Sequence, residues 1–207
     1  MSVRFAPGVL VAGTYVVDRF LGRGASGEVW AATHVWTREP VALKVLAEEA
    51  AADEETAERF RREAIFLARA AGEHVARIVD FVSDPGAGMV LVMELVDGES
   101  LARVLDRRTL SVEEAVALGV DLLAGVAALH GAGVIHRDLK PGNVLLRVRP
   151  DGSTVPVLCD FGLSRLARGR PTDASDPSLT DLTRGDVAMG TLRYMAPEQV
   201  LNARQAT

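Results

Sequence analysis

The stretch VIHRDLKPGNVLL, residues 134 to 146, constrains the fold of this chain more than any other. It sets four polar side chains, those of Arg137, Asp138, Lys140 and Asn143, within seven positions between two aliphatic runs. Charges that leave water without partners are costly, so a fold that holds this loop must supply counter-charges or a ligand. The loop follows a predicted buried helix and leads into a short predicted strand. It is therefore the first candidate for a functional site.

Composition indicates a globular protein. The chain has 207 residues, of which 48% are hydrophobic and 25% charged, enough for one sizeable core or two small ones. A net charge of −5 and an isoelectric point near 5.4 argue against nucleic-acid binding, which needs a strongly basic surface. We therefore expect discrete ligands or proteins as partners and no nucleic acid.

Three features point to the cytoplasm. The single cysteine, Cys159, excludes an internal disulfide framework and fits a reducing compartment. The chain opens with no basic, hydrophobic, cleavable pattern, so we predict no secretion signal. The longest apolar stretch contains Asp121 and His130, which favours a buried helix over a membrane span. We expect a cytoplasmic protein with no membrane segment within this chain, and an anchor encoded beyond residue 207 stays open.

The first half of the chain predicts a small sheet with one helix packed on it. Residues 14–34 contain two β-rich runs around a glycine cluster, and residues 39–47 alternate with the strand period. Residues 53–71 carry apolar side chains at three- and four-residue intervals, which is typical of a helix. Two further strand-like runs, residues 76–82 and 88–96, flank a turn.

The second half predicts a long helix followed by a hairpin. Ser111 and Glu114 form a capping box that starts the helix, and Gly131 is placed to stop it. Two short aliphatic runs, residues 144–146 and 155–159, predict the hairpin. The apolar stripe of the helix consists of Val112, Ala115, Val116, Leu122, Leu123, Val126 and Leu129.

The glycine cluster LGRGASGEVW spaces Gly22, Gly24 and Gly27 as G-x-G-x-x-G. Because glycine has no Cβ, backbone amides in such a loop can approach phosphate oxygens closely. A dinucleotide-binding fold needs a helix after this turn, whereas a strand-like run follows here, so that interpretation is rejected. Taken alone, the cluster is explained equally well by a plain glycine-rich hairpin turn.

Lys44 shares its predicted strand face with Ala42 and Leu46. An isolated strand lysine usually extends to water, but if this face is covered the ammonium needs an anionic partner. Glu63 is the best candidate, because it lies on the inward edge of the predicted helix. The alternative is that Glu63 forms an ordinary surface pair with Arg59.

Three oxygen donors follow one another in and after the charged loop. Asp138 and Asn143 stand five positions apart, and the pairing of the predicted hairpin would bring Asn143 and Asp160 to the same end. Such oxygens suit Mg²⁺, which prefers carboxylates and phosphate oxygens, and Asp138 would then accept a proton from a nucleophilic hydroxyl. Asp and Asn are also common turn residues, which would explain any two of these positions but not all of them in this order.

Taken together, GRGASGEV, VALK, Glu63, HRDLKPGN, DFG and APE resemble, in order, the signature set of eukaryotic-like protein kinases. The lysine two residues after the aspartate of HRDLKPGN resembles the pattern of the serine/threonine branch. The alanine-rich composition and the segment GEVWAATH resemble bacterial, Hanks-type members of the family. The resemblance covers residues 15–199 and implies an α+β, bilobal fold. Residues 1–96 would form a β-rich N-lobe with one helix, and residues 97–207 an incomplete, mainly helical C-lobe.

The resemblance also implies a role for each matching position around ATP and Mg²⁺. Lys44, held by Glu63, would contact the α- and β-phosphates. Asp138 would orient the substrate hydroxyl and take its proton, and Lys140 would steady the transferred phosphate. The phosphates would be covered by Gly22, Gly24 and Gly27, and Mg²⁺ would be held by Asn143 and Asp160.

The adenine would lie between the lobes. It would be bound by the side chains of Leu21, Val29, Ala42 and Leu145, by the backbone of Glu94 and Val96, and next to Met93 as gatekeeper. A stacked spine linking the lobes would consist of Leu67, Ile78, His136 and Phe161.

Regulation is implied by Arg137, which precedes the proposed catalytic aspartate. A guanidinium there can clamp a phosphate, so the resemblance implies an enzyme switched on by phosphorylation of its activation loop. That loop would be the polar segment 164–189, with Thr183 and Thr180 as candidate sites.

The implied function is ATP- and Mg²⁺-dependent transfer of the γ-phosphoryl group to Ser or Thr hydroxyls of protein substrates, with autophosphorylation of the activation loop. Two departures weigh on it: Ala25 and Ser26 stand where many members have an aromatic residue, and the chain stops at Thr207, before the remaining large-lobe helices. The alternatives are an inactive truncated fragment or pseudokinase that binds nucleotide or acts as a scaffold, and a small-molecule phosphotransferase. DFG, APE and the Ser/Thr-rich loop disfavour the last.

Overall fold

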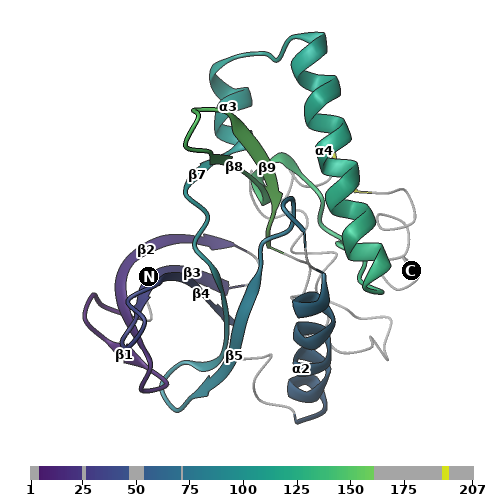
Figure 1. The fold of residues 1–207 in the computed structure, drawn as a ribbon. Coiled ribbons are helices and arrows are strands. Elements are labelled where there is room, and N and C mark those ends of the chain that lie inside the picture. The colour runs from purple at the N-terminus through teal and green to yellow at the C-terminus, as the bar shows by residue number, and fades with distance from the viewer. Residues whose placement is uncertain (1–4, 25–26, 47–53, 71, 161–192, 196–207) are drawn as a thin grey trace.

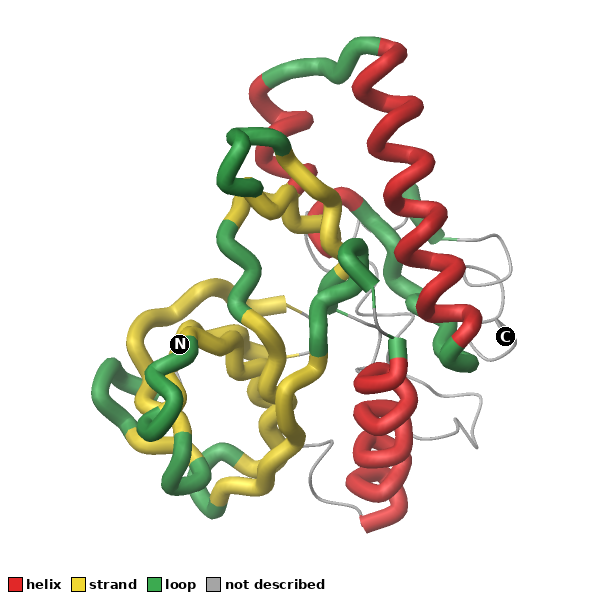
Figure 2. Tube along the Cα trace, in the orientation of Figure 1, coloured by secondary structure: helices red, strands yellow, loops and turns green. Residues whose placement is uncertain are grey.

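The computed structural model describes residues 5–24, 27–46, 54–70, 72–160 and 193–195 (Figure 1). Figure 2 shows that the strands gather in two groups, with one long helix beside each group. The larger sheet has six strands in the order β1-β2-β3-β4-β6-β5, and every neighbouring pair is antiparallel. Its strands are β1 (Leu10–Val11), β2 (Tyr15–Gly24), β3 (Gly27–His34), β4 (Pro40–Leu46), β5 (Ile78–Asp84) and β6 (Gly88–Glu94), and α2 (Glu54–Arg69) packs against β5.

The second group of elements follows the end of β6. Its three-stranded sheet has the order β7-β8-β9. Its elements are β7 (Gly98–Ser100), α3 (Leu101–Arg107), α4 (Val112–Gly131), the 3-10 turn η1 (Pro141–Asn143), β8 (Val144–Val148) and β9 (Thr154–Leu158). The long strands, both long helices and the β8–β9 hairpin are confirmed predictions, whereas β1 and β7 are short strands that the sequence analysis did not identify.

The described residues of β4 are buried on both faces, so the face of Lys44, which the sequence left open, is covered. Val41, Leu43 and Val45 point into one core cluster with Tyr15 and Trp30. The alternate residue Ala42 belongs to a second cluster on the other face. A strand covered on both sides leaves no route to water for a polar side chain at its centre.

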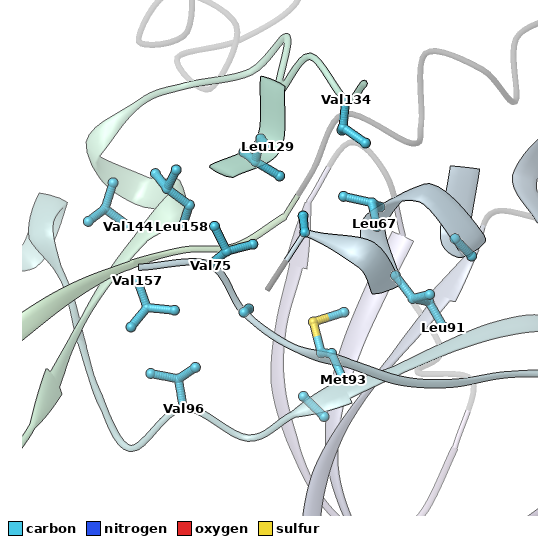
Figure 3. Close-up of a cluster of buried hydrophobic side chains, with 14 of the residues drawn as sticks. Leu67, Val75, Leu91, Met93, Val96, Leu129, Val134, Val144, Val157 and Leu158 are labelled. Carbon is cyan, nitrogen blue, oxygen red and sulfur yellow. The ribbon is translucent and has the colours of Figure 1, made fainter. Parts of the chain in front are cut away.

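The second core cluster joins the two sheets (Figure 3). Figure 3 shows Leu67 of α2 and Leu91 of β6 on one side, and Leu129 of α4 and Val157 of β9 on the other, with Val75 between them. Val75 lies in the segment between α2 and β5 and forms a parallel bridge with Leu158. The chain crosses from the larger to the smaller sheet between Glu94 and Gly98, and the predicted boundary at residue 96 stays a prediction.

α4 begins as predicted and differs from prediction at its end and on one face. The capping box is complete: Glu114 donates its N–H to the Ser111 hydroxyl, and its carboxylate accepts from the Ser111 N–H. Gly131 is still helical, and the left-handed residue after the helix is Gly133, with φ 78°.

The predicted apolar stripe of α4 covers two faces. Leu122, Val126 and Leu129 pack on the core, whereas Val112 and Leu123 are 74% and 69% exposed. Apolar residues on more than one face of a helix favour burial of each of those faces. For this reason the sequence alone could not show that Val112 and Leu123 are exposed while Leu122 and Leu129 are packed. No helix within the described ranges has the length and apolar character needed to cross a bilayer.

Candidate functional site

Lys44 is the most deeply buried charge of the larger sheet. It lies at the centre of β4 with 2% of its surface exposed, between Val29 of β3 and Leu91 of β6. Its ammonium forms an ion pair with the Asp160 carboxylate. Asp160 follows β9, 116 positions further along the chain, so this pair links the two sheets. A buried ammonium needs such a partner, because an unpaired charge in this position would cost several kcal/mol.

Glu63 was the predicted partner of Lys44. It lies within α2, as expected, but its side chain is outside the part of the chain that the structure describes. The Glu63 interaction therefore stays a prediction, while the Asp160 interaction is one that the sequence analysis did not anticipate. The 116 positions between Lys44 and Asp160 explain why no local spacing indicated it.

Asp160 is held by the end of the β8–β9 hairpin. Val144 pairs with Leu158, and the next residue, Cys159, donates its N–H to the Asn143 carbonyl at 2.9 Å. Asn143 and Asp160 thus lie at the same end of the hairpin, as the sequence predicted. Asp160 has φ 56°, a left-handed conformation that is uncommon for non-glycine residues but more frequent for aspartate than for most.

The charged loop forms a network centred on Asp138. Its Oδ2 accepts from Lys140 Nζ at 2.8 Å and from Asn143 Nδ2 at 2.9 Å. Asn143 Nδ2 also donates to the Asp138 carbonyl at 2.8 Å. Asp138, Lys140 and Asn143 therefore satisfy one another's charges and hydrogen-bonding groups. Asp138 and Lys140 remain 26% exposed, so both can meet a ligand from solvent.

His136 connects the charged loop to the Asp160 segment. It is 4% exposed, and its Nε2 lies 3.2 Å from the Cys159 carbonyl. Burial lowers the pKa of His136 below its ordinary value, an effect that the Cys159 carbonyl partly opposes. A neutral ring that donates from Nε2 and accepts the Asp138 N–H at Nδ1, 3.4 Å away, satisfies both contacts. The sequence analysis gave His136 a packing role and missed these hydrogen bonds.

The glycine-rich cluster forms the hairpin between β2 and β3. Gly24 pairs with Gly27, which has φ 129° and therefore favours glycine. Arg23 and Glu28 form an ion pair across this hairpin, and Glu28 Oε2 also accepts from Trp30 Nε1 at 3.0 Å. Gly22 stands opposite Val29. A Cβ built at Gly22 meets nothing within 4 Å, so packing among the described residues does not require glycine there.

Five of the seven residues predicted to bind adenine gather in one cluster, and Glu94 directly follows one of them, Met93. Ala42, Met93 and Val96 are buried in the cluster that joins the two sheets, and Val29 and Leu145 pack against it. Leu21 is 38% exposed and is not part of that cluster. Of the predicted spine residues, Leu67, Ile78 and His136 are buried or half-buried near the same junction, whereas Phe161 lies outside the described residues. The candidate phosphorylation sites Thr180 and Thr183 also lie outside them.

The donor set can be tested for a metal ion. No cluster of three His, Cys, Asp or Glu side chains that could hold a metal occurs in the described part of the chain. Asn143 uses its amide nitrogen in both bonds to Asp138, so those bonds do not occupy the amide oxygen, the atom a metal would bind. One carboxylate and one amide oxygen suit Mg²⁺ if phosphate oxygens and water complete its six ligands.

Lysine is rare in this chain, and its rarity is a sequence feature that could have marked the site residues but was not used in the sequence analysis. Among 23 basic residues, Lys44 and Lys140 are the only lysines. Every other basic position carries arginine, whose planar fork is suited to carboxylates, whereas an ammonium is a compact point charge. The two positions that retain lysine are the two that the motifs single out.

Comparisons of the sequence with a family model and with curated relatives point to the same family. The family model described as "Protein kinase domain" matches residues 15–207. The chain is 40% identical over 195 residues to serine/threonine-protein kinase PkaB of Streptomyces coelicolor, and 41% identical over 203 residues to serine/threonine-protein kinase pkn2 of Myxococcus xanthus. These alignments cover 92% and 98% of this chain but 44% and 23% of the relatives, so the chain spans less than half of their length.

A solved structure shares the fold. The crystal structure of the PknI kinase domain from Mycobacterium tuberculosis superposes with a TM-score of 0.65 at 35% identity, covering 77% of this chain and 62% of that one. This similarity confirms the predicted α+β, bilobal fold class. The first part is β-rich with one helix, and the second part bears the charged loop.

Proposed function

The chain belongs to the protein kinase domain family, and from the geometry of its site we propose that it transfers the γ-phosphoryl group of ATP to Ser or Thr hydroxyls of protein substrates with the help of Mg²⁺. The observation that carries this proposal is the ion pair between buried Lys44 and half-buried Asp160, next to the Asp138 network. It supports one site to which both halves of the chain contribute.

Lys44 would bind the α- and β-phosphates through its ammonium. Its present partner, Asp160, is 31% exposed and can turn toward a ligand, whereas Lys44 itself is fixed in the sheet. The glycine hairpin would cover the phosphates with backbone amides. The adenine would lie against the cluster that joins the two sheets, bound by the backbone of Glu94 and Val96.

Asp160 and the amide oxygen of Asn143 would hold Mg²⁺. When bound, this ion neutralises negative charge on the phosphate oxygens. The chain's own contribution is to fix the two ligands at one end of the β8–β9 hairpin, through the bond from the Cys159 N–H to the Asn143 carbonyl. Holding the two residues together before the nucleotide arrives reduces the rearrangement that binding requires.

Asp138 would orient the acceptor hydroxyl and take its proton at a carboxylate oxygen. The hydroxyl oxygen then bonds to the γ-phosphorus, the bond from that phosphorus to the bridging oxygen breaks, and ADP leaves with the electron pair. Lys140, 2.8 Å from Asp138, would balance the charge of the transferred group.

The same proposal includes regulation and location. Autophosphorylation at Thr183 or Thr180 would give Arg137 a phosphate to clamp, which is the usual way in which an added phosphate orders a loop. We place the enzyme in the cytoplasm, because one cysteine in 207 residues suits a reducing compartment.

The test is a transfer assay on the chain of residues 1–207 with γ-labelled ATP, Mg²⁺ and a generic protein substrate. We expect transfer by the wild type and a loss of about 100-fold or more in Asp138→Asn, which keeps the hydrogen bonds but cannot accept the proton. Asp106→Asn, an exposed aspartate of α3, is the matched control and should transfer as the wild type does.

Two outcomes would contradict the proposal. ATP binding without transfer, in the wild type and Asp138→Asn alike, would support a non-catalytic nucleotide-binding module. Equal transfer by both proteins would remove Asp138 from the chemistry. Phosphate found by mass spectrometry on Thr180 or Thr183 of the wild type would exclude a small-molecule phosphotransferase as the sole activity.

A further inference from the structure

Arg147 of β8 contacts both ends of the segment that crosses between the two sheets. The crossing consists of residues 95–97, after Glu94 ends β6 and before Gly98 begins β7. At one end, Arg147 Nη2 donates to Glu94 Oε1 at 2.7 Å. At the other end, the backbone of Arg147 stands opposite Gly98 in the β7–β8 pairing. A single residue thus fixes the crossing from both sides.

The approach of β7 to β8 is close. A Cβ built on Gly98 would lie 2.1 Å from the Leu146 carbonyl oxygen, so only glycine fits there. One residue further along β8, Val148 donates its N–H to the Asp97 carbonyl at 3.2 Å. The far end of the crossing is therefore held to β8 by the backbone, whereas the described link from β8 to the Glu94 end is the Arg147 side chain.

Glu94 also bonds to the residue directly before β5, so its contact with Arg147 links a third strand to the smaller sheet. Its Oε1 also accepts the N–H of Arg77, directly before β5, at 3.0 Å, and its own N–H donates to the Arg77 carbonyl at 2.9 Å. The Arg147 guanidinium therefore ties the end of β6 and the start of β5 to the smaller sheet through one carboxylate.

A second arginine offers a natural comparison. Arg149, two positions on, donates to Glu73 at 2.5 Å. The side chains of this pair are 42% and 52% exposed, against 30% and 23% for Arg147 and Glu94. Exposed ion pairs contribute little, whereas a charged hydrogen bond that is mostly shielded from water contributes more. The two pairs have the same chemistry, but only the first reaches the crossing.

We propose that Arg147 is a positioning residue for purine recognition, holding the backbone of Glu94 and Val96 in the place where adenine binds. The inference rests on the proposed function, because it takes the crossing to be the adenine site. The inference predicts that the two parts of the nucleotide respond differently. Binding of the base depends on Arg147, whereas binding of the phosphates depends on Lys44 and Asp160, with which no described contact of Arg147 is made.

The experiment measures dissociation constants by calorimetry for Mg·ATP, adenosine and Mg·tripolyphosphate with the wild type, Arg147→Met, Arg147→Lys and Arg149→Met. We expect Arg147→Met to weaken Mg·ATP and adenosine by about fivefold to tenfold, the effect of one partly shielded charged hydrogen bond. Tripolyphosphate should bind within about twofold of the wild type, since a lost contact to the crossing does not reach the phosphate site.

The controls separate positioning from general stability. Arg147→Lys keeps a donor for Glu94 and should recover part of the loss, and Arg149→Met should bind all three probes as the wild type does. In a Glu94→Gln background, Arg147→Met should add less than its effect in the wild type, because the two changes remove the same ion pair.

The outcomes are distinguishable. Unchanged adenosine and ATP binding in Arg147→Met, or an equal loss for tripolyphosphate, overturns this inference and leaves the proposed function intact. A wild type that binds none of the three probes overturns the proposed function and this inference with it.

Discussion

Gly125 of α4 provides a sharp test of how the second half of the chain packs against the segment before β5. A Cβ built there lies 2.9 Å from the His74 carbonyl oxygen and 3.0 Å from Leu158 Cδ1. The His74 carbonyl cannot move freely, because it accepts the Leu158 N–H at 2.8 Å. Alanine at this position would therefore push α4 away from the junction.

The expected magnitude follows from two opposing effects. Replacing a mid-helix glycine by alanine gains about 1 kcal/mol of helix propensity. Forcing a methyl group into a packed site costs about 1 to 3 kcal/mol. Gly125→Ala should therefore lower the free energy of unfolding by about 1 kcal/mol. Gly119 of the same helix is the matched control, because a Cβ there meets nothing within 4 Å. Gly119→Ala should raise the free energy of unfolding by about 1 kcal/mol.

Urea unfolding of the three proteins, followed by far-ultraviolet circular dichroism, measures this difference. The two variants should differ by about 2 kcal/mol, or about 4 to 8 °C in melting temperature for a chain of this size. Gly125→Ala as stable as Gly119→Ala would refute the close approach of α4 to the His74 segment.

Two further predictions concern titrating groups. Burial raises the pKa of the Cys159 thiol to about 12. Its reaction with iodoacetamide near neutral pH should therefore be about a thousandfold slower than in urea-unfolded protein, and equal rates would contradict the raised pKa. Asp84 accepts the N–H groups of Ala12, Gly86 and Ala87, and these bonds hold its pKa below 3.8. A depressed carboxyl pKa stabilises the fold above the unfolded value and loses that contribution as the pH falls through the folded value. Asp84→Asn should therefore be less stable than the wild type near pH 6, with a deficit that shrinks in urea titrations as the pH falls below the ordinary aspartate pKa. A constant deficit would contradict this reasoning.

Local signals in the sequence predicted the elements that depend on local physics. The alternation of residues 40–46 gave the correct faces of β4, and the Ser111–Glu114 spacing gave the correct start of α4. β1 and β7 have two and three residues, and such strands exist because a neighbour pairs with them, so their own sequences carry no period.

Contacts between distant residues could not be predicted in the same way. The Glu63 interaction with Lys44 stays a prediction, and no spacing along the chain indicated Asp160, the described partner from the other sheet. The Arg147–Glu94 pair joins residues 53 positions apart and has no motif. The exposed face of α4 at Val112 and Leu123 was predicted to be buried, because hydrophobicity indicates what a helix favours and not what covers it.

The central claim is that Lys44 and Lys140, from different sheets, reach the phosphates of one nucleotide. An ATP derivative with an acyl group on its terminal phosphate would acylate amines near that phosphate, and the chain offers no lysines besides these two. Mass spectrometry of the treated protein should find the acyl group on both lysines, and an excess of Mg·ATP should protect both. Acylation at the N-terminus alone, or at either lysine without protection by Mg·ATP, would contradict the account.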